Sequence, residues 1–434
     1  MIFSAVTLGC KVNQYETQSI ESTLASRGHV RAEAGQGCDV CVINTCAVTA
    51  ESVRKSRQTV RRMKKLEPGA LIAVCGCLAQ LEPGEVLPLG ADLVGGSGDR
   101  LEFAKEIEML FQDKKRAGLV VTGDPFARGY FEELQPGCAS GRTRAMIKIQ
   151  DGCDNYCAYC IVPYARGRSR SLPAERAANH ARKLAADGFR EIVVTGIEIS
   201  SYGKDLRDSP RLTGVLKEIS KAVPNARLRL GSLDPGAITE DFCREISGLP
   251  GLCGHFHLSL QSGCDETLRR MGRKYGANDV FKAISLLRRQ FPDCGVTADL
   301  ITGFPGETDT EFEITMQFLE AAEFSDMHIF PFSPRPGTSA AIMPGQVEKS
   351  VRRQRAKTAA AAAARMAHSF RLKQVGRTVE VLFERKHGGL WTGLSGSYIE
   401  IAVKSDVGKN SVHHVRITAA GDEGVFGEVV LDES

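Results

Sequence analysis

The sequence lacks any apolar run of the roughly 18 residues that a transmembrane helix needs, so we expect no membrane span. Its first ten residues are apolar and end in Thr-Leu-Gly-Cys, but they have no basic region and are too short for a signal peptide. We therefore expect a cytoplasmic protein. An excess of charge of one sign is also missing. With 56 Lys and Arg against 52 Asp and Glu, the net charge of +4 indicates no particular partner.

Compositional bias is absent as well. Hydrophobic residues make up 42% and charged residues 25% of the 434 positions, which excludes disordered, collagen-like and disulfide-scaffold proteins. At roughly 150 residues per domain, this length predicts about three domains. The chain has 14 cysteines. Because structural disulfides are rare in a reducing compartment, these cysteines are expected to be metal ligands, redox centres or core thiols.

Residues 1–135 alternate between predicted strands and helices, a pattern typical of a parallel, doubly wound α/β domain. The predicted strands are 2–8, 39–44, 70–75 and 92–94, and the predicted helices are 13–27, 51–66 and 101–111. Cys10, Cys46 and Cys77 lie just beyond three of these strands. Since ligands of such sheets bind outside the carboxyl ends of the strands, we expect the three thiols to converge at one edge.

A second alternating region follows at residues 139–370, after a predicted linker (114–143) that is rich in glycine and turn formers. Its predicted strands are 144–150, 191–195, 227–230, 255–260, 296–301 and 327–330. About six βα units predict a full or partial (β/α) barrel, whose active site would lie on the loops after the strands.

The last region, residues 371–434, predicts a small all-β barrel of OB-like type. It contains short Val- and Ile-rich segments broken by glycine, at 378–383, 398–403, 412–417 and 425–431. Residues 348–373, which lead into it, are predicted to form one long helix.

The most informative motif is Gly-Cys-Asp-Asn-Tyr-Cys-Ala-Tyr-Cys at 152–160, directly after the first strand of the barrel-like region. Cys153, Cys157 and Cys160 are three thiolates on one loop, and a [4Fe–4S] cluster takes four ligands, so one iron would stay open for a substrate or cofactor. Zinc is the alternative, with Cys38 and Cys41 as the second ligand pair. A thioredoxin-like redox pair is a third interpretation.

The Cys-x3-Cys-x2-Cys spacing at the start of a βα barrel, with an aromatic residue before the last cysteine, resembles radical S-adenosylmethionine (SAM) enzymes. In that family SAM binds the open iron, and the transfer of one electron to SAM cleaves it to give a 5′-deoxyadenosyl radical. Further segments are similar to the methylthiotransferases within this superfamily, and the last domain resembles a TRAM domain. These segments are residues 7–14, 44–49, 75–77, 201–203, 227–232, 260–264 and 302–308.

The resemblance implies that Cys10, Cys46 and Cys77 hold a second [4Fe–4S] cluster, which donates or carries sulfur. Spacing alone does not choose Cys77 over Cys75, although Cys75 is expected within its strand and Cys77 past its end. The other cysteines match no family ligand and are expected to be core or surface thiols. They are Cys38, Cys41, Cys138, Cys243, Cys253, Cys264 and Cys294.

SAM is expected to lie along the strand ends of the barrel. The residues expected to bind it are Tyr159, Gly196, Glu198, Ser232, Gln261 and Gly303. Tyr159 lies between cluster ligands and is placed beside the adenine, and Glu198 is placed on a ribose hydroxyl. For each glycine the simpler interpretation is a plain βα turn. His257 is expected to be a core residue rather than a catalytic one.

Contact with RNA is predicted from basic blocks, which suit phosphate binding. Residues 52–65 hold seven basic residues and no acid, and 348–373 hold eight against one. Arg166, Arg168 and Arg170 form a third group after the cluster loop. Solvated helix faces are the alternative. Residues 371–434 hold eight basic and nine acidic residues, so a TRAM-like domain would need a local basic face.

Residues 7–14 and 161–171 look most like the methylthiotransferases that act on N6-threonylcarbamoyladenosine at position 37 of tRNA. The resemblance implies the tRNA anticodon stem-loop, a reductant and a sulfur source as partners. It also implies that one SAM methylates a sulfur at the amino-terminal cluster while a second supplies the radical that takes hydrogen from C2. The alternatives are isopentenyl-adenosine in tRNA, a ribosomal-protein aspartate, a radical SAM methylase with idle amino-terminal cysteines, and a non-catalytic tRNA-binding iron–sulfur carrier.

Overall fold

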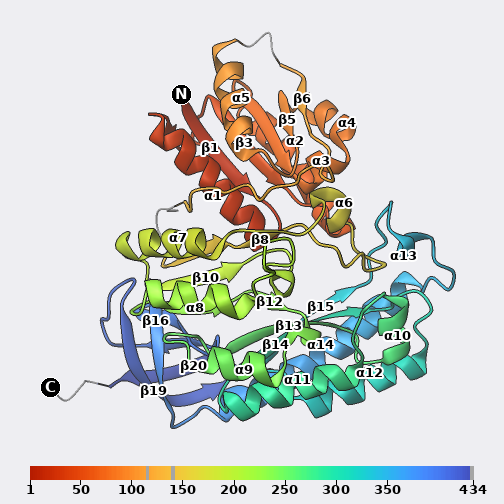
Figure 1. Ribbon diagram of the computed structural model, residues 1–434, viewed down its shortest axis with the longest axis vertical. Coiled ribbons are helices and arrows are strands. Elements are labelled where there is room, and N and C mark those ends of the chain that lie inside the picture. The colour runs from red at the N-terminus through yellow and green to blue at the C-terminus, as the bar shows by residue number, and fades with distance from the viewer. Residues whose placement is uncertain (114–116, 138–141, 431–434) are drawn as a thin grey trace.

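The computed structural model describes residues 1–113, 117–137 and 142–430, and Figure 1 shows three structural units. They are an amino-terminal parallel sheet with helices, an array of parallel strands wrapped by helices, and a carboxy-terminal β-barrel. The predicted α/β fold class with a small all-β domain is therefore confirmed. Within the described residues, no helix is long and apolar enough to cross a bilayer.

The first sheet has six parallel strands in the order β2-β1-β3-β4-β5-β6. They are β1 (Ile2–Thr7), β2 (Val30–Arg31), β3 (Val40–Thr45), β4 (Leu71–Gly76), β5 (Leu93–Gly95) and β6 (Leu119–Val121). The strand order reverses between β1 and β3, and at such a switch point a crevice opens beyond the carboxyl ends. The sequence pattern missed β2 and β6 because they have only two and three residues. Strand β6 lies inside the predicted linker.

Helices cover both faces of this sheet, as a doubly wound fold requires. They are α1 (Lys11–Ser26), α2 (Ala50–Leu66), α3 (Cys77–Leu81), α4 (Pro83–Val86) and α5 (Arg100–Gln112). Ile20 of α1 and Phe103 of α5 pack with one set of strand side chains, and Val60 of α2 and Leu78 of α3 pack with the other. Because successive residues of a strand face opposite sides of the sheet, one strand can contribute side chains to both cores.

The second unit is a partial barrel of six parallel strands, as predicted. They are β7 (Arg144–Lys148), β10 (Glu191–Thr195), β11 (Arg227–Leu230) with its continuation β12 (Ser232–Leu233), β13 (His255–Gln261), β14 (Gly295–Thr302) and β15 (Asp326–Pro331). The main helices around it are α7 (Ala174–Ala186), α8 (Leu212–Ala222), α9 (Glu240–Ser247), α10 (Asp265–Arg270), α11 (Ala277–Gln290), α12 (Asp309–Ala322) and α14 (Lys349–Leu372). Helix α14 runs across the predicted boundary at 371, and the boundary at 139 lies outside the described residues.

The inner face of the partial barrel is polar, whereas its outer face is the apolar core under the helices. Leu228, Phe256 and Val296 belong to that core. The alternate positions carry Arg229, His257 and similar polar side chains, as expected from the period of two along a strand. His257 therefore does not lie in the helix-packed core as predicted. Its ring bonds Thr297 Oγ1 (2.9 Å) and lies 3.3 Å from Asp299 Oδ2.

The third unit is a closed five-stranded barrel in the order β16-β17-β18-β20-β19. Its strands are β16 (Thr378–His387), β17 (Leu390–Ser395), β18 (Glu400–Val403), β19 (Val412–Gly421) and β20 (Gly424–Val429). Strand β17, which holds the only tryptophan, was not predicted. It follows the tight turn at Gly388 and Gly389, which breaks the pattern that would have marked it.

The small barrel closes the amino-terminal end of the partial barrel. Tyr398, which precedes β18, stacks on His255 with ring centroids 4.5 Å apart and lies 5.0 Å below the Arg229 guanidinium. Arg229 also donates to the carbonyls of Ser395 (3.0 Å) and Gly396 (2.9 Å) and pairs with Glu191. The opposite end, where the strands finish, holds the cysteine loop.

Candidate active site

The cysteine loop is held in a hairpin at the top of the partial barrel. It connects β8 (Gln150–Asp151) to α6 (Val162–Arg166) and β9 (Arg170–Ser171), which pairs antiparallel with β8. Gly152 has φ +71°, and a Cβ there would lie 1.9 Å from the Arg168 carbonyl oxygen. Only glycine fits at this turn. The backbone of Ala158 donates to the Met271 carbonyl (2.9 Å), which fixes the far side of the loop.

The three thiols of this loop form one electrostatic group. Cys153 and Cys157 are buried and Cys160 is half-buried. Burial and the neighbouring thiols raise the pKa of Cys153 to about 11 and that of Cys160 to about 12. Such thiols keep their protons at neutral pH unless a metal replaces them, and a coordinating thiol is deprotonated outright. The donor set therefore fits an iron–sulfur cluster.

Arg273 also belongs to this site, and sequence reasoning missed it. Its Nη1 donates to the sulfur of Cys157 (3.2 Å), and its Nη2 donates to Asp234 (3.1 Å). The guanidinium also lies over the Tyr275 ring at 4.6 Å. A donor to this sulfur stabilises negative charge on it, as expected of groups around metal ligands. Arg273 lies in a loop without a recognisable motif, so no local pattern marked it.

Among the predicted SAM-binding residues, Glu198 is buried close to Asp234, which lies two positions beyond Ser232 in the sequence. Burial together with Asp234 raises the pKa of Glu198 to about 7. Gly196 leaves room for Gln150, whose Oε1 accepts from the Glu198 backbone (2.8 Å).

Tyr159, Gln261 and Gly303, also predicted to bind SAM, differ in what surrounds them. The Tyr159 ring meets Phe304, next to Gly303, edge to face at 6.4 Å. Gln261 has φ +68° at a register shift of β13, which distinguishes it from ordinary strand residues. The Gly303 backbone N–H donates to Glu307 (2.6 Å), and a Cβ at this position would clash with Arg352 of α14. Glycine at position 303 is therefore explained by packing.

The amino-terminal thiols meet at the switch point of the first sheet. Cys10 ends the loop after β1, Cys46 follows β3 and Cys77 begins α3. Gly76 has φ +100°, and a Cβ there would lie 2.4 Å from the Thr45 carbonyl oxygen, so glycine is required before Cys77. Burial raises the pKa of Cys77 to about 12, its neighbours Cys46 and Cys10 add to this, and Arg166 opposes it. Cys75 lies within β4 and faces Arg100 instead.

Of the other described cysteines, Cys38 and Cys41 lie at the opposite end of β3 from Cys46, where Cys38 Sγ is 3.3 Å from Ser4 Oγ. They cannot complete a zinc site with the cysteine loop. In the described part of the chain no three His, Cys, Asp or Glu side chains converge on one metal ion as zinc requires, whereas the thiols around a four-iron cluster each bind a different iron. Cys243, Cys253, Cys264 and Cys294 are buried, and Cys138 lies outside the described residues.

A buried ion network joins the two thiol groups. Arg166 pairs with Glu16 of α1 (2.7 Å) and Asp151 (2.9 Å) and donates to Asn13 (2.8 Å). Arg100 and Lys148 also pair with Glu16. Burial alone would raise the pKa of Glu16, but these three cations lower it to about 2.

The network corrects one prediction. Arg166 and Arg170 are buried, with 1% and 5% exposure, so they are not available to RNA phosphates as expected. Only Arg168 of that group is exposed.

Replacing Arg166 by methionine is expected to destabilise the protein. Removing one partner of a buried ion pair leaves the other charge uncompensated, so we expect a cost of about 3 kcal/mol, or roughly 6–12 °C in Tm. Arg168→Met, two residues away and exposed, should change Tm little. Calorimetry at neutral pH is the right test, because the stability contributed by Glu16 is present above its ordinary pKa of 4.5 and lost as pH falls towards 2. Equal Tm values for the two variants would contradict a structural role for the network.

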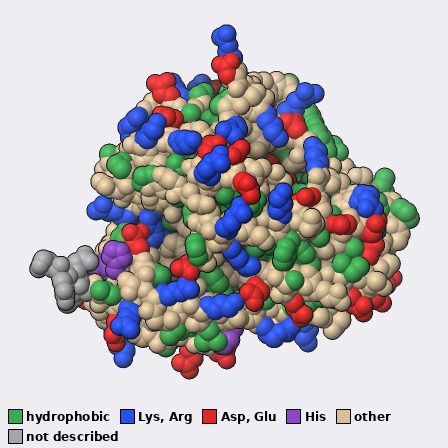
Figure 2. All heavy atoms as spheres, turned by 60° about the horizontal axis from the view of Figure 1, so that its bottom comes forward, with side chains coloured by type: hydrophobic (Ala, Val, Ile, Leu, Met, Phe, Trp, Pro, Cys, Tyr) green, Lys and Arg blue, Asp and Glu red, His purple; other side chains and the backbone are tan. Residues whose placement is uncertain are grey.

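In the two long basic blocks, residues 52–65 and 348–373, some basic side chains form ion pairs within the protein. On α2, Arg57 pairs with Glu82 and Lys64 with Asp92. On α14, Arg355 is buried against Glu307 and Asp309. Among the described residues, Arg61, Arg62, Lys65, Lys349, Arg353 and Lys357 form no ion pair within 4 Å and stay available to phosphates. Figure 2 shows basic and acidic side chains interspersed on the face that it draws.

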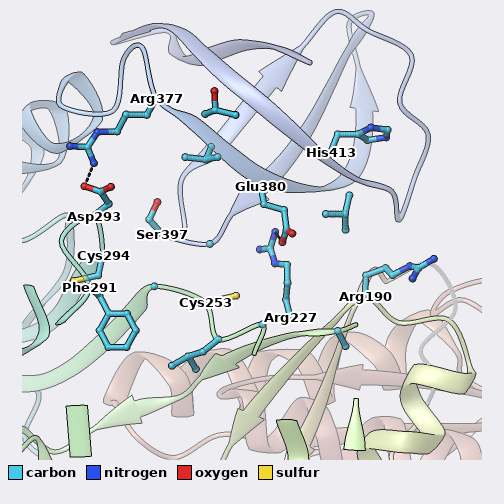
Figure 3. A pocket seen from close by; sticks show the side chains of 18 of the residues that line it. Arg190, Arg227, Cys253, Phe291, Asp293, Cys294, Arg377, Glu380, Ser397 and His413 are labelled. Atoms are coloured by element: carbon cyan, nitrogen blue, oxygen red, sulfur yellow. Dashed lines mark ion pairs between the residues drawn. The ribbon is translucent and has the colours of Figure 1, made fainter. Parts of the chain in front are cut away.

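A cavity of about 1360 Å³ lies at the other end of the partial barrel, between it and the small barrel. Figure 3 shows Arg227 of β11 and Glu380 of β16 pointing toward each other across it, 3.7 Å apart, and Arg377 paired with Asp293. The cavity adjoins the amino-terminal ends of the strands. The chemistry of this fold lies at the carboxyl ends, so we place the active site at the cysteine loop.

Comparisons with known proteins show which family the chain resembles. The Radical SAM superfamily matches residues 147–319, and the uncharacterized protein family UPF0004 matches residues 3–96. The threonylcarbamoyladenosine tRNA methylthiotransferase MtaB of Bacillus subtilis is 36% identical over 98% of this chain and 96% of its own. The tRNA-2-methylthio-N(6)-dimethylallyladenosine synthase of Caldicellulosiruptor saccharolyticus is 31% identical, covering 99% and 92%.

Among solved structures, the radical SAM methyltransferase TsrM from Kitasatospora setae is similar in fold, with a TM-score of 0.59. It is 16% identical, and the match covers 79% of this chain and 77% of that one. Relatives above 30% identity along nearly the whole chain, together with three thiols on a loop above a partial barrel, fix the family. The chain belongs to the radical SAM methylthiotransferases.

Proposed function

We propose that the enzyme methylthiolates C2 of N6-threonylcarbamoyladenosine at position 37 of tRNA. The near full-length likeness to the Bacillus subtilis enzyme, whose name states a threonylcarbamoyladenosine tRNA substrate, carries this proposal. The buried link between the two thiol groups supports it, because transfer of a methylthio group needs sulfur and radical chemistry at one substrate. The tRNA anticodon stem-loop is then the macromolecular partner, in the cytoplasm.

The cysteine loop is assigned the radical cluster. Cys153, Cys157 and Cys160 would hold a [4Fe–4S] cluster with one open iron, where SAM binds. Bound together, the cluster and SAM would supply a 5′-deoxyadenosyl radical for hydrogen removal at C2, with one electron from a reductant. Arg273 holds Cys157, and Glu198 with Asp234 offers acceptors for ribose hydroxyls. Tyr159, Gly196, Ser232, Gln261 and Gly303 complete the proposed SAM pocket.

The amino-terminal thiols are assigned a second [4Fe–4S] cluster. Cys10, Cys46 and Cys77 would hold it as the carrier or donor of the sulfur that leaves with the product. Arg166 lies close to these thiols, and its positive charge favours the thiolate form of Cys77. A sulfur source must recharge this site after each turnover.

Deleting the gene in its host is expected to remove 2-methylthio-N6-threonylcarbamoyladenosine from tRNA. The nucleoside without the methylthio group should accumulate, because its synthesis precedes this step. Digestion of total tRNA and mass spectrometry of the nucleosides measures both. Expression of the intact gene from a plasmid should restore the modified nucleoside, and a Cys157→Ala gene should not.

The second candidate substrate is dimethylallyl-adenosine, also called isopentenyl-adenosine, which the name of the Caldicellulosiruptor relative specifies. Loss of its methylthio derivative in the deletion strain would keep the chemistry and overturn the substrate. Unchanged tRNA nucleosides with a shifted ribosomal-protein mass would overturn the RNA substrate itself.

A further inference from the structure

A cavity of about 740 Å³ lies between the start of α1, strands β7 and β10, and the small barrel. Its charged lining is mainly basic, with Lys11, Arg142, Arg144, Arg385 and Lys409 against Glu384 and Glu400. A lining with an excess of positive charge attracts anions.

Both acids of this lining are already paired. Arg144 pairs with Glu384 (2.9 Å) and Arg385 pairs with Glu400 (2.6 Å), while Arg142 donates to the neutral Gln14 side chain (3.1 Å). The ammonium of Lys11 differs. Lys11 as a whole residue is exposed, but it lines the cavity, and burial of its ammonium there lowers its pKa. Within the described residues it has no ion pair within 4 Å and no side-chain hydrogen bond. An anion bound here would give this ammonium the partner that it lacks.

The position of Lys11 is informative. It directly follows Cys10, one of the thiols assigned to the sulfur-carrying cluster. Its electrostatic neighbours are Tyr398, Arg229, Arg144 and Asp299, which belong to the inner face of the partial barrel and to its closing loop. Asp299 is the one acid among them, and its carboxylate is shared with His257 at 3.3 Å. An anion bound by Lys11 would thus lie between the sulfur-bearing thiols and the inner face of the barrel.

We propose that Lys11 binds the carboxylate of the threonylcarbamoyl group on the substrate base and selects this base over dimethylallyl-adenosine. The inference rests on the function proposed above. The threonylcarbamoyl group has one carboxylate, which gains a charge-assisted hydrogen bond from an ammonium group. The dimethylallyl group is a hydrocarbon, so placing it here would strip water from Lys11 and offer no partner. A tRNA phosphate is the other anion that Lys11 could meet, and the experiment separates the two.

The test uses the holoenzyme with both clusters reconstituted and three anticodon stem-loops of one sequence. They carry threonylcarbamoyladenosine, its carboxylate-to-methylamide derivative, and dimethylallyl-adenosine. Fluorescence anisotropy under anaerobic conditions gives each Kd. We expect the wild type to prefer the acid over the amide by about tenfold or more, the range of hydrogen bonds to charged groups.

Lys11→Gln should lose this preference by weakening acid binding alone, and Lys11→Arg should keep it. Lys221→Gln, an exposed change at the far end of α8, is the matched control and should leave all three Kd values unchanged. Circular dichroism and iron content verify that the variants are folded and loaded.

Two results would overturn the assignment. One is a wild type that binds acid and amide equally. The other is a Lys11→Gln variant that weakens all three RNAs alike and lowers the salt slope by about one, which would indicate a phosphate contact. Product analysis separates these outcomes from failure of the proposed function. If the wild type methylthiolates only the dimethylallyl RNA, the substrate is wrong. If the wild type methylthiolates the RNA with the free carboxylate while Lys11→Gln still prefers that RNA over the amide, only the role assigned to Lys11 is wrong.

Discussion

Replacing any one of Cys153, Cys157 and Cys160 by alanine is expected to abolish reductive cleavage of SAM. Three protein ligands are the minimum for a four-iron cluster that leaves one iron open, so losing one removes the site for SAM. The measurement is 5′-deoxyadenosine formed from SAM with dithionite, assayed by chromatography on the reconstituted protein. We expect the rate to fall to that seen without enzyme.

Cys243→Ala is the matched control, because Cys243 is buried in the helix-packed core of the same unit. It should retain its iron and its SAM cleavage, with at most a modest loss of stability. Normal 5′-deoxyadenosine formation by any one of the three loop variants would show that the radical cluster is held elsewhere.

Replacing Cys10, Cys46 and Cys77 together by alanine is expected to separate the two halves of the reaction. The iron content should fall from about eight to about four per chain, the count for one [4Fe–4S] cluster. Cleavage of SAM should persist, because the cysteine loop is intact, while methylthio transfer to tRNA stops. Iron and sulfide assays, 5′-deoxyadenosine formation and nucleoside mass spectrometry measure the three quantities on one preparation.

The double variant Cys38→Ala, Cys41→Ala is the control from the same domain. These thiols lie at the opposite end of β3, so iron content and methylthio transfer should stay near wild type. A triple variant that keeps its full iron and still thiolates tRNA would rule out the proposed second cluster site. Loss of SAM cleavage in a folded triple variant would show that the two sites depend on each other.

The positions of both thiol groups could be predicted because they follow from the order of strands. A cysteine just after a parallel strand must lie at the carboxyl edge, and this holds for Cys10, Cys46 and the loop after β7. Spacing alone leaves the choice between Cys75 and Cys77 open, and the structure adds a local difference between them. A residue inside β4 points into the sheet's core, whereas the first residue of α3 lies beyond its edge.

The pairing of charges could not be predicted. Arg166 and Arg170 looked like RNA contacts because they stand in a basic run, but Arg166 meets Glu16, which is 150 positions away in sequence. Composition along the chain carries no information on such contacts. Arg273 was missed for the same reason, since its bond to Cys157 joins two loops that come together only in the folded protein.

The contact of Tyr398 with Arg229 and His255 means that the small barrel is not a detachable module. Arg227 and Arg229 find acceptors on the carbonyls of Leu394, Ser395 and Gly396, so a chain cut after α14 would leave two guanidinium groups inside the partial barrel short of partners. Such groups are costly to leave unpaired, so the two units should unfold cooperatively. A chimera that exchanges carboxy-terminal domains between relatives must therefore keep residues equivalent to 394–398 in the new barrel, or the amino-terminal end of the partial barrel loses its closure.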